Sequence, residues 1–261
     1  MNQEAFIEYA TSPNLTVDEV FTIEMLIDFV ESRLPGHDWD AWSKRIDARK
    51  SPNYRPAFKR ELLRPAVQEL SKRVWISLQD RSNQRPIRRL DAFRFFEKVT
   101  TLVISDNEVT DLTPLAACTA LRNLYTNRNA IEDLSALVSL PYLEELEIAD
   151  NPIADFSPLE PAPALKSLTI SADQIPAFSR VANLSKLEKL ELHGGTFTSF
   201  EGWPEMPNLR VLRGAAVDDL RGLEKFLRVE NVIGMTGKFT SLQPLEALTR
   251  LTHIHVVGGF L

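Results

Sequence analysis

The chain has 261 residues, of which 44% are hydrophobic and 25% are charged, and its formal net charge at neutral pH is −6. This composition excludes a disordered or fibrous protein, because the apolar fraction is large enough to bury a core. No apolar run reaches the roughly 18 residues that a membrane span needs, and the single cysteine, Cys118, excludes an internal disulfide.

The first ten residues lack the features of a secretory leader. They contain Glu4 and Glu8 but neither a basic start nor a long apolar core. Together with the lone cysteine, this favours a cytoplasmic location.

The segment from Thr16 to Leu34 has the pattern of an amphipathic helix. Thr16 is suited to the N-cap, Glu19 completes a capping box three residues later, and Pro35 ends the helix. Its expected buried stripe consists of Val20, Phe21, Met25, Leu26, Phe29 and Val30.

Two further helices are predicted, from about Asp38 to Lys50 and from about Pro56 to Leu78, the second interrupted at Pro65. The apolar positions of the second helix are Phe58, Leu62, Leu63, Val67, Leu70 and Val74. We therefore expect a helical domain over residues 1–98.

Charge is segregated along the chain. Residues 1–43 carry a net charge of −8, residues 44–98 carry +10, and residues 99–261 carry −8. The basic helical region could bind nucleic acid. Against this, the flanking acidic blocks can neutralise its charge within the protein, and the sequence contains no DNA-reading motif beside it. Nucleic acid is therefore kept as the alternative partner, and the residues that would bind it are Arg55, Lys59, Arg60, Arg64, Lys72 and Arg73.

From residue 99 onward the sequence repeats with a period of 22. One aliphatic column contains Val99, Leu121, Leu143, Leu165, Leu187, Leu209, Val229 and Leu251. A second, three residues later, contains Leu102, Leu124, Leu146, Leu168, Leu190, Leu212, Val232 and Ile254. The sixth unit, from Leu209 to Arg228, is two residues short, and a deletion in its turn restores every later column. Seven units and a partial eighth result, which is typical of a solenoid.

The first three units also carry an asparagine at the same turn position, at Asn107, Asn129 and Asn151. With the pattern LxxLxLxxNxIxDLxPL from Val99 to Leu115, the repeat resembles the leucine-rich-repeat family, and within it the 22-residue class found in internalins. The resemblance implies an asparagine ladder between turns, which should weaken after the third unit because the asparagine is then replaced.

The resemblance and the pattern together predict an α/β solenoid, a horseshoe with a parallel β-sheet on its concave face. Pro114, Pro158 and Pro244 favour short 3₁₀ or extended segments on the convex face. Because an uncovered end would expose several apolar side chains, residues 1–98 are expected to cap the repeat domain, residues 99–261. At the other end the sequence stops partway through a unit, which indicates either a chain continuing beyond Leu261 or a last strand covered by a partner or a second copy.

Alternation along each strand places the residues beside the buried columns on the concave face. Ile233 and Met235 are also expected there, as exposed partner-binding residues or packed beneath a cap. Tyr125 is the preferred anchor, and the glutamates suit a partner protein with a basic surface. The candidate protein-binding residues are Asn123, Tyr125, Glu145, Glu147, Lys189, Glu191, His193, Arg213, His253 and His255.

No pattern for catalysis or for a cofactor is present. The sequence has no GxSxG elbow or HExxH helix, and His253 with His255 lacks an evident third metal ligand. We therefore predict a non-enzymatic protein-binding module without cofactor or metal. Such a module could be a bacterial immunity or antitoxin protein, an adaptor, or a regulatory subunit of an enzyme. A further contact with a partner, or self-association, is expected at the C-terminal end of the repeats.

Overall fold

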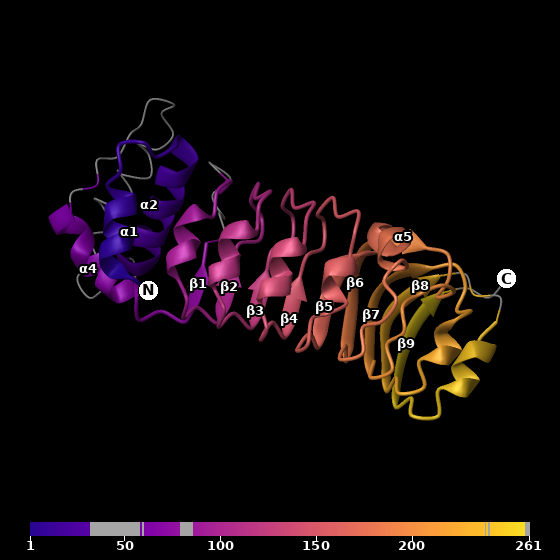
Figure 1. Ribbon diagram of the computed structural model, residues 1–261. Helices are drawn as coiled ribbons and strands as arrows, with labels where there is room; N and C mark the ends of the chain where they lie inside the picture. The colour runs from indigo at the N-terminus through magenta and orange to yellow at the C-terminus, as the bar shows by residue number, and fades with distance from the viewer. Residues whose placement is uncertain (32–57, 59, 79–85, 238, 240, 259–261) are drawn as a thin grey trace.

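A computed structural model describes residues 1–31, 58, 60–78, 86–237, 239 and 241–258. The molecule is elongated, with helices at its N-terminal end followed by repeating units that each add one strand to a single sheet (Figure 1). This arrangement confirms the predicted leucine-rich-repeat solenoid with a helical N-terminal cap. Of the helices in the described ranges, none has the length and apolar character that a bilayer crossing needs.

The cap contains three described helices, α1 (Gln3–Ala10), α2 (Val17–Glu31) and α4 (Arg60–Leu70). The predicted capping box of α2 is present, because the Thr16 backbone N–H donates to the Glu19 carboxylate and the Glu19 N–H donates to Thr16 Oγ1. Phe6 of α1 packs edge-on against Phe96 in the first unit of the solenoid, with ring centroids 5.7 Å apart. The cap thus covers the apolar end of the repeat stack. The predicted helix from Asp38 to Lys50 lies outside the described residues.

The helix predicted to reach Leu78 is shorter than expected. It ends at Leu70 and continues through Pro65 without interruption. The next strand, β1, follows within a few residues, with Ile76 fully buried and Val74 53% exposed. The helical prediction failed here because residues 75–77 pair with the edge of the sheet, and this tertiary pairing overrides the local pattern.

In the described part of the chain, nine parallel strands lie side by side in chain order. They are β1 (Trp75–Ser77), β2 (Thr101–Val103), β3 (Asn123–Tyr125), β4 (Glu145–Glu147), β5 (Ser167–Ser171), β6 (Lys189–Phe197), β7 (Val211–Val217), β8 (Asn231–Gly237) and β9 (His253–Gly258). Thr101 pairs with Asn123 and Val211 with Asn231, so the 22-residue period and the short sixth unit both appear in the strand register. The sheet begins at Trp75, before the first repeat read from the sequence, while the division at residue 98 stays a prediction.

The convex face consists of short helical segments, most of which start two residues before the last apolar position of their unit. They are η1 (Asp91–Phe95), η2 (Thr113–Ala117), η3 (Ser135–Ser139), η4 (Ser157–Leu159), η5 (Ala172–Gln174), α5 (Ile175–Phe178), η6 (Leu223–Lys225) and η7 (Gln243–Ala247). All but α5 are 3₁₀ helices. Pro114, Pro158 and Pro244 lie in the first turns of η2, η4 and η7, where a missing N–H is tolerated. The predicted 3₁₀ character of this face is confirmed.

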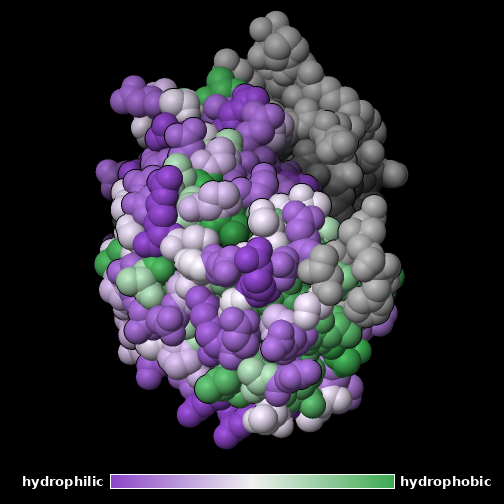
Figure 2. Space-filling view, turned by 90° about the vertical axis from the view of Figure 1, so that its right-hand side faces the viewer, coloured by the Kyte–Doolittle hydropathy of each residue, from purple (hydrophilic) through white to green (hydrophobic). Residues whose placement is uncertain are grey.

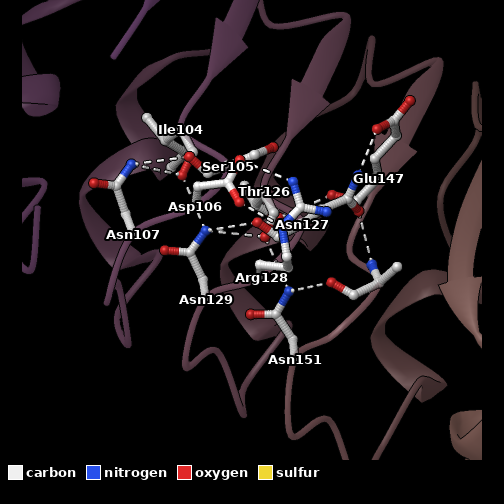
Figure 3. A network of polar contacts seen from close by, with 11 residues as sticks. Ile104, Ser105, Asp106, Asn107, Thr126, Asn127, Arg128, Asn129, Glu147 and Asn151 are labelled. Carbon is white, nitrogen blue, oxygen red and sulfur yellow. Dashed lines mark hydrogen bonds and ion pairs between the residues drawn. The ribbon is translucent and has the colours of Figure 1, made fainter. Parts of the chain in front are cut away.

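The asparagine ladder connects the first turns (Figure 3). Asn151 accepts a hydrogen bond from the Ile131 N–H at 3.0 Å and donates to the Thr126 carbonyl at 2.9 Å, both in the preceding unit. Asn129 and Asn107 repeat this arrangement one and two units earlier. Each side chain therefore satisfies backbone groups that the turn would otherwise bury unpaired.

Beyond Asn151 the strands extend into the turns instead. β6 to β9 have six to nine residues, whereas β2 to β4 have three. Gly214 permits this, because its φ is +82° and a Cβ would lie 2.1 Å from the Leu192 carbonyl oxygen. The ladder weakens as predicted, and strand pairing replaces it.

Candidate binding surface on the concave face

Two rows of side chains cross the concave face in register. The first row contains Asn123, Glu145, Lys189 and His253, and the second contains Tyr125, Glu147, Glu191, Arg213 and His255. On β2, β3 and β4 the central residue is buried while its two neighbours are half-buried, which matches the predicted alternation. All ten candidate residues thus lie on one sheet, but the structure divides them into groups with different electrostatics.

The first group lies on β3 and β4 and is acidic. The Tyr125 hydroxyl donates to Glu145 Oε2 at 2.8 Å, and the Asn127 amide donates to Glu147 Oε2 at 2.6 Å. Among the described residues neither carboxylate has a cationic partner, since both of these donors are neutral. Burial, and then the hydrogen bond to Glu145, raise the pKa of Tyr125, so the hydroxyl stays protonated as a donor.

The second group lies on β6 and β7 and surrounds one carboxylate with basic side chains. Glu191 lies 3.0 Å from Lys189 Nζ, 3.6 Å from His193 Nε2 and 3.9 Å from an Arg213 nitrogen. Burial by itself would raise the pKa of Glu191, but the hydrogen bond from Lys189 and the neighbouring positive charges outweigh it and lower that pKa. Glu191 is therefore neutralised within the protein and does not belong to the acidic group.

The third group lies on β8 and β9 and contains the two histidines. His253 and His255 are exposed, and His253 Nδ1 lies 2.9 Å from the Thr252 hydroxyl. Met235 is fully buried, so of the two alternatives left open by the sequence it is packed rather than facing a partner; an irregularity in the β8–β9 register after Ile233 turns it into the core. No cluster of three metal-ligating side chains occurs in the described part of the chain.

Asn127 was missed by the sequence interpretation. It lies two residues after Tyr125, just beyond the end of β3. There its side-chain amide donates a hydrogen bond to Glu147 and accepts one from the Ala149 N–H at 2.9 Å. The signal was present, since the turn reads Asn-Arg-Asn and only the second asparagine belongs to the ladder column.

A charged row at 22-residue spacing was also missed: Arg122 and Lys166 both pair with Glu144 at the rim of the sheet.

Two of the basic residues of the alternative nucleic-acid site are paired with carboxylates among the described residues. Arg64 lies 2.8 Å from Glu4, and Lys72 lies 2.5 Å from Glu69. Arg73 is half-buried between α4 and β1. Arg55 and Lys59 lie outside the described residues, as does the side chain of Arg60. Two of the six residues are thus paired within the protein, and the nucleic-acid alternative stays a prediction.

Hydrophobic residues gather at the end of the molecule formed by β9 and η7 (Figure 2). Ile254 is 48% exposed and Val257 is 53% exposed, whereas Val232, the equivalent of Ile254 one unit earlier, is fully buried. The difference arises because no described strand packs beyond β9.

Comparisons with known proteins agree with this architecture. A family model described as "Leucine Rich repeats (2 copies)" matches residues 97–139. The crystal structure of internalin C2 from Listeria monocytogenes is 24% identical with a TM-score of 0.52, over 63% of this chain and 74% of that one. TLR13, solved as a complex with ssRNA13, is 18% identical with a TM-score of 0.50, over 65% and 26% of the two chains. Among curated proteins no sequence matches this one. The structural likenesses establish the fold.

Proposed function

We propose that this leucine-rich-repeat protein, whose solenoid has an internalin-like fold, binds a partner protein through its concave face and catalyses no reaction. The observation that carries the proposal is the set of polar side chains held in register across the parallel strands. Tyr125, Glu145 and Glu147 are positioned by hydrogen bonds on a rigid sheet, so little conformational entropy is lost when a partner binds them.

Tyr125 is the expected anchor of the interface. Its ring is half-buried on β3 and its hydroxyl is fixed by Glu145, which gives a large contact area with few freely rotating bonds.

The one thiol offers no alternative chemistry, because burial raises the pKa of Cys118 to about 12 and leaves it without a nucleophilic thiolate at neutral pH.

At a finer level, the proposal is a cytoplasmic binding protein. A bacterial immunity or antitoxin protein masks a toxin by covering its surface, and an adaptor or regulatory subunit binds an enzyme in the same way. A surface without catalytic groups suits these roles equally well, and the identity of the captured partner will decide between them.

The test is affinity capture from native lysate treated with nuclease, with mass spectrometry of the retained proteins. The test variant combines Tyr125→Ala, Glu147→Lys and Glu191→Lys. The matched control makes the same changes away from the concave rows, as Tyr142→Ala, Glu132→Lys and Glu246→Lys; all three control side chains are exposed. A protein retained by the wild type and the control but lost by the test variant supports the proposal.

If both variants retain the same protein, the concave face is not the interface. The alternative partner, nucleic acid, predicts capture that is abolished by nuclease, weakens steeply with salt and is lost on charge reversal at Arg60 and Arg64.

A further inference from the structure

We propose that the concave face is bipolar and selects an extended protein segment that carries basic residues at one end and acidic residues at the other. This inference rests on the proposed function and names the chemistry of the partner. It replaces the partner with a basic surface that the glutamates suggested from the sequence.

The acidic half of the face consists of Glu145 and Glu147 on β4. Each carboxylate receives one hydrogen bond from a neutral donor, on its Oε2 atom, and each has an Oε1 atom without a hydrogen bond from the described residues. A carboxylate accepts several hydrogen bonds, and guanidinium or ammonium groups are its strongest donors. This half therefore fits arginine or lysine side chains.

The basic half consists of Lys189 on β6 and Arg213 on β7. Among the described residues both cations share a single carboxylate, Glu191, so a net positive charge remains. Arg213 lies 3.9 Å from Glu191, too far for a hydrogen bond, and its side chain is 47% exposed. No described residue hydrogen-bonds its fork of N–H donors, which can therefore receive a carboxylate from a partner.

The strand between the two halves is uncharged. β5 presents Ser167 and Thr169 to the same rows, with Thr169 buried. The step from β4 to β7 spans three strand spacings, which is about 14 Å at the usual ~4.8 Å between strands. An extended chain covers that distance in roughly four residues. The two charges of the partner segment should therefore be separated by about that number of residues.

A partner of one sign fits only half of this face. A uniformly basic segment seated on Glu147 would meet Arg213 further along, and a uniformly acidic segment would meet the β4 glutamates. Like charges placed together in an interface oppose binding, so the arrangement discriminates against both.

The experiment measures fluorescence polarisation of the full chain with labelled 12-residue peptides. The bipolar peptide has two arginines and two glutamates separated by four glycine and serine residues, and the other peptides are all-basic, all-acidic and bipolar with no spacer. Three test variants reverse the acidic half (Glu145→Lys with Glu147→Lys), the basic half (Lys189→Glu with Arg213→Glu), or both. The control reverses four exposed charges elsewhere (Glu132→Lys, Glu246→Lys, Lys186→Glu and Arg250→Glu) and keeps the same net charge.

We expect the wild type and the control to bind the spaced bipolar peptide about tenfold more tightly than the other peptides at low salt, since several partly exposed ion pairs add modest contributions. Reversing the acidic half should shift the preference to the acidic peptide, and reversing the basic half should shift it to the basic peptide. Reversing both should restore the preference for the bipolar peptide, bound in the opposite direction.

A wild type that prefers the all-basic or the all-acidic peptide, or binds none of them, overturns the bipolar inference. The lysate capture described above separates this failure from failure of the proposed function. If a protein is captured through the concave face while the peptides do not discriminate, only the bipolar inference falls.

Discussion

The asparagine ladder provides the sharpest test of how the repeats hold together. Asn151 is only 6% exposed, and its side chain joins two units: Oδ1 accepts from the Ile131 N–H at 3.0 Å, and Nδ2 donates to the Thr126 and Ile148 carbonyls at 2.9 and 3.1 Å. Asn151→Ala removes these bonds and leaves the Ile131 N–H without its acceptor. No other described group accepts from that donor.

The expected loss follows from these contacts. A buried donor left without a partner costs about 1–3 kcal/mol, and each lost hydrogen bond contributes about 0.5–1.5 kcal/mol. We therefore expect Asn151→Ala to lower the free energy of unfolding by about 3 kcal/mol, or roughly 6–12 °C in Tm for a chain of this size. Urea denaturation followed by circular dichroism measures the change directly.

Asn231→Ala is the matched control, because Asn231 is half-buried on the same sheet and makes no side-chain hydrogen bond among the described residues. Its loss should stay below about 0.5 kcal/mol. If Asn151→Ala is no more destabilising than Asn231→Ala, the ladder does not stabilise the turns and the reasoning is refuted. Asn151→Asp gives a second readout, since a carboxylate facing two carbonyl oxygens should be more destabilising at pH 7 than at pH 4, relative to the wild type.

Four further predictions test other parts of the structure. Cys118, with its pKa raised to about 12 by burial, should react with a thiol reagent at pH 8 only after the protein unfolds, and rapid labelling of the native protein would contradict its burial. Gly214→Ala should cost more than about 2 kcal/mol in denaturant titrations, because of its positive φ and the close carbonyl oxygen. The hydrogen bond from Arg89 lowers the pKa of Asp91 in the folded protein. The stability that this ion pair contributes is therefore present above the unfolded-state pKa of about 4 and is lost as the pH falls through the lower folded-state pKa. Asp91→Asn should make the fall of Tm with decreasing pH less steep in thermal melts. Self-association at the β9 end predicts a concentration-dependent mass in sedimentation, which Ile254→Lys should abolish and the exposed, distant Val138→Lys should leave unchanged.

Much of the fold could be predicted from the sequence, because the repeated units within this one chain can be aligned with one another. Every unit must bury the same apolar positions against its neighbours, so the columns fix the strand register. Leu146 is buried as predicted, and Glu145 and Glu147 beside it face outward. The capping box at Thr16 and the prolines of the convex face were also readable, because each acts within a few residues of chain.

The remaining features depended on contacts between distant residues. Residues 75–77 form a strand rather than a helix because β2 offers them an edge to pair with. Met235 turns inward because the register of β8 against β9 slips at that point. The polarity of the binding surface was decided in the same way. Counted along the chain, Glu191 belongs with Glu145 and Glu147, but in the sheet it lies among Lys189, His193 and Arg213, and the acidic face becomes a bipolar one. Sequence periodicity determines which side chains share a face, whereas the charge of that face depends on distances of a few ångströms between side chains of neighbouring strands, which only the tertiary structure sets.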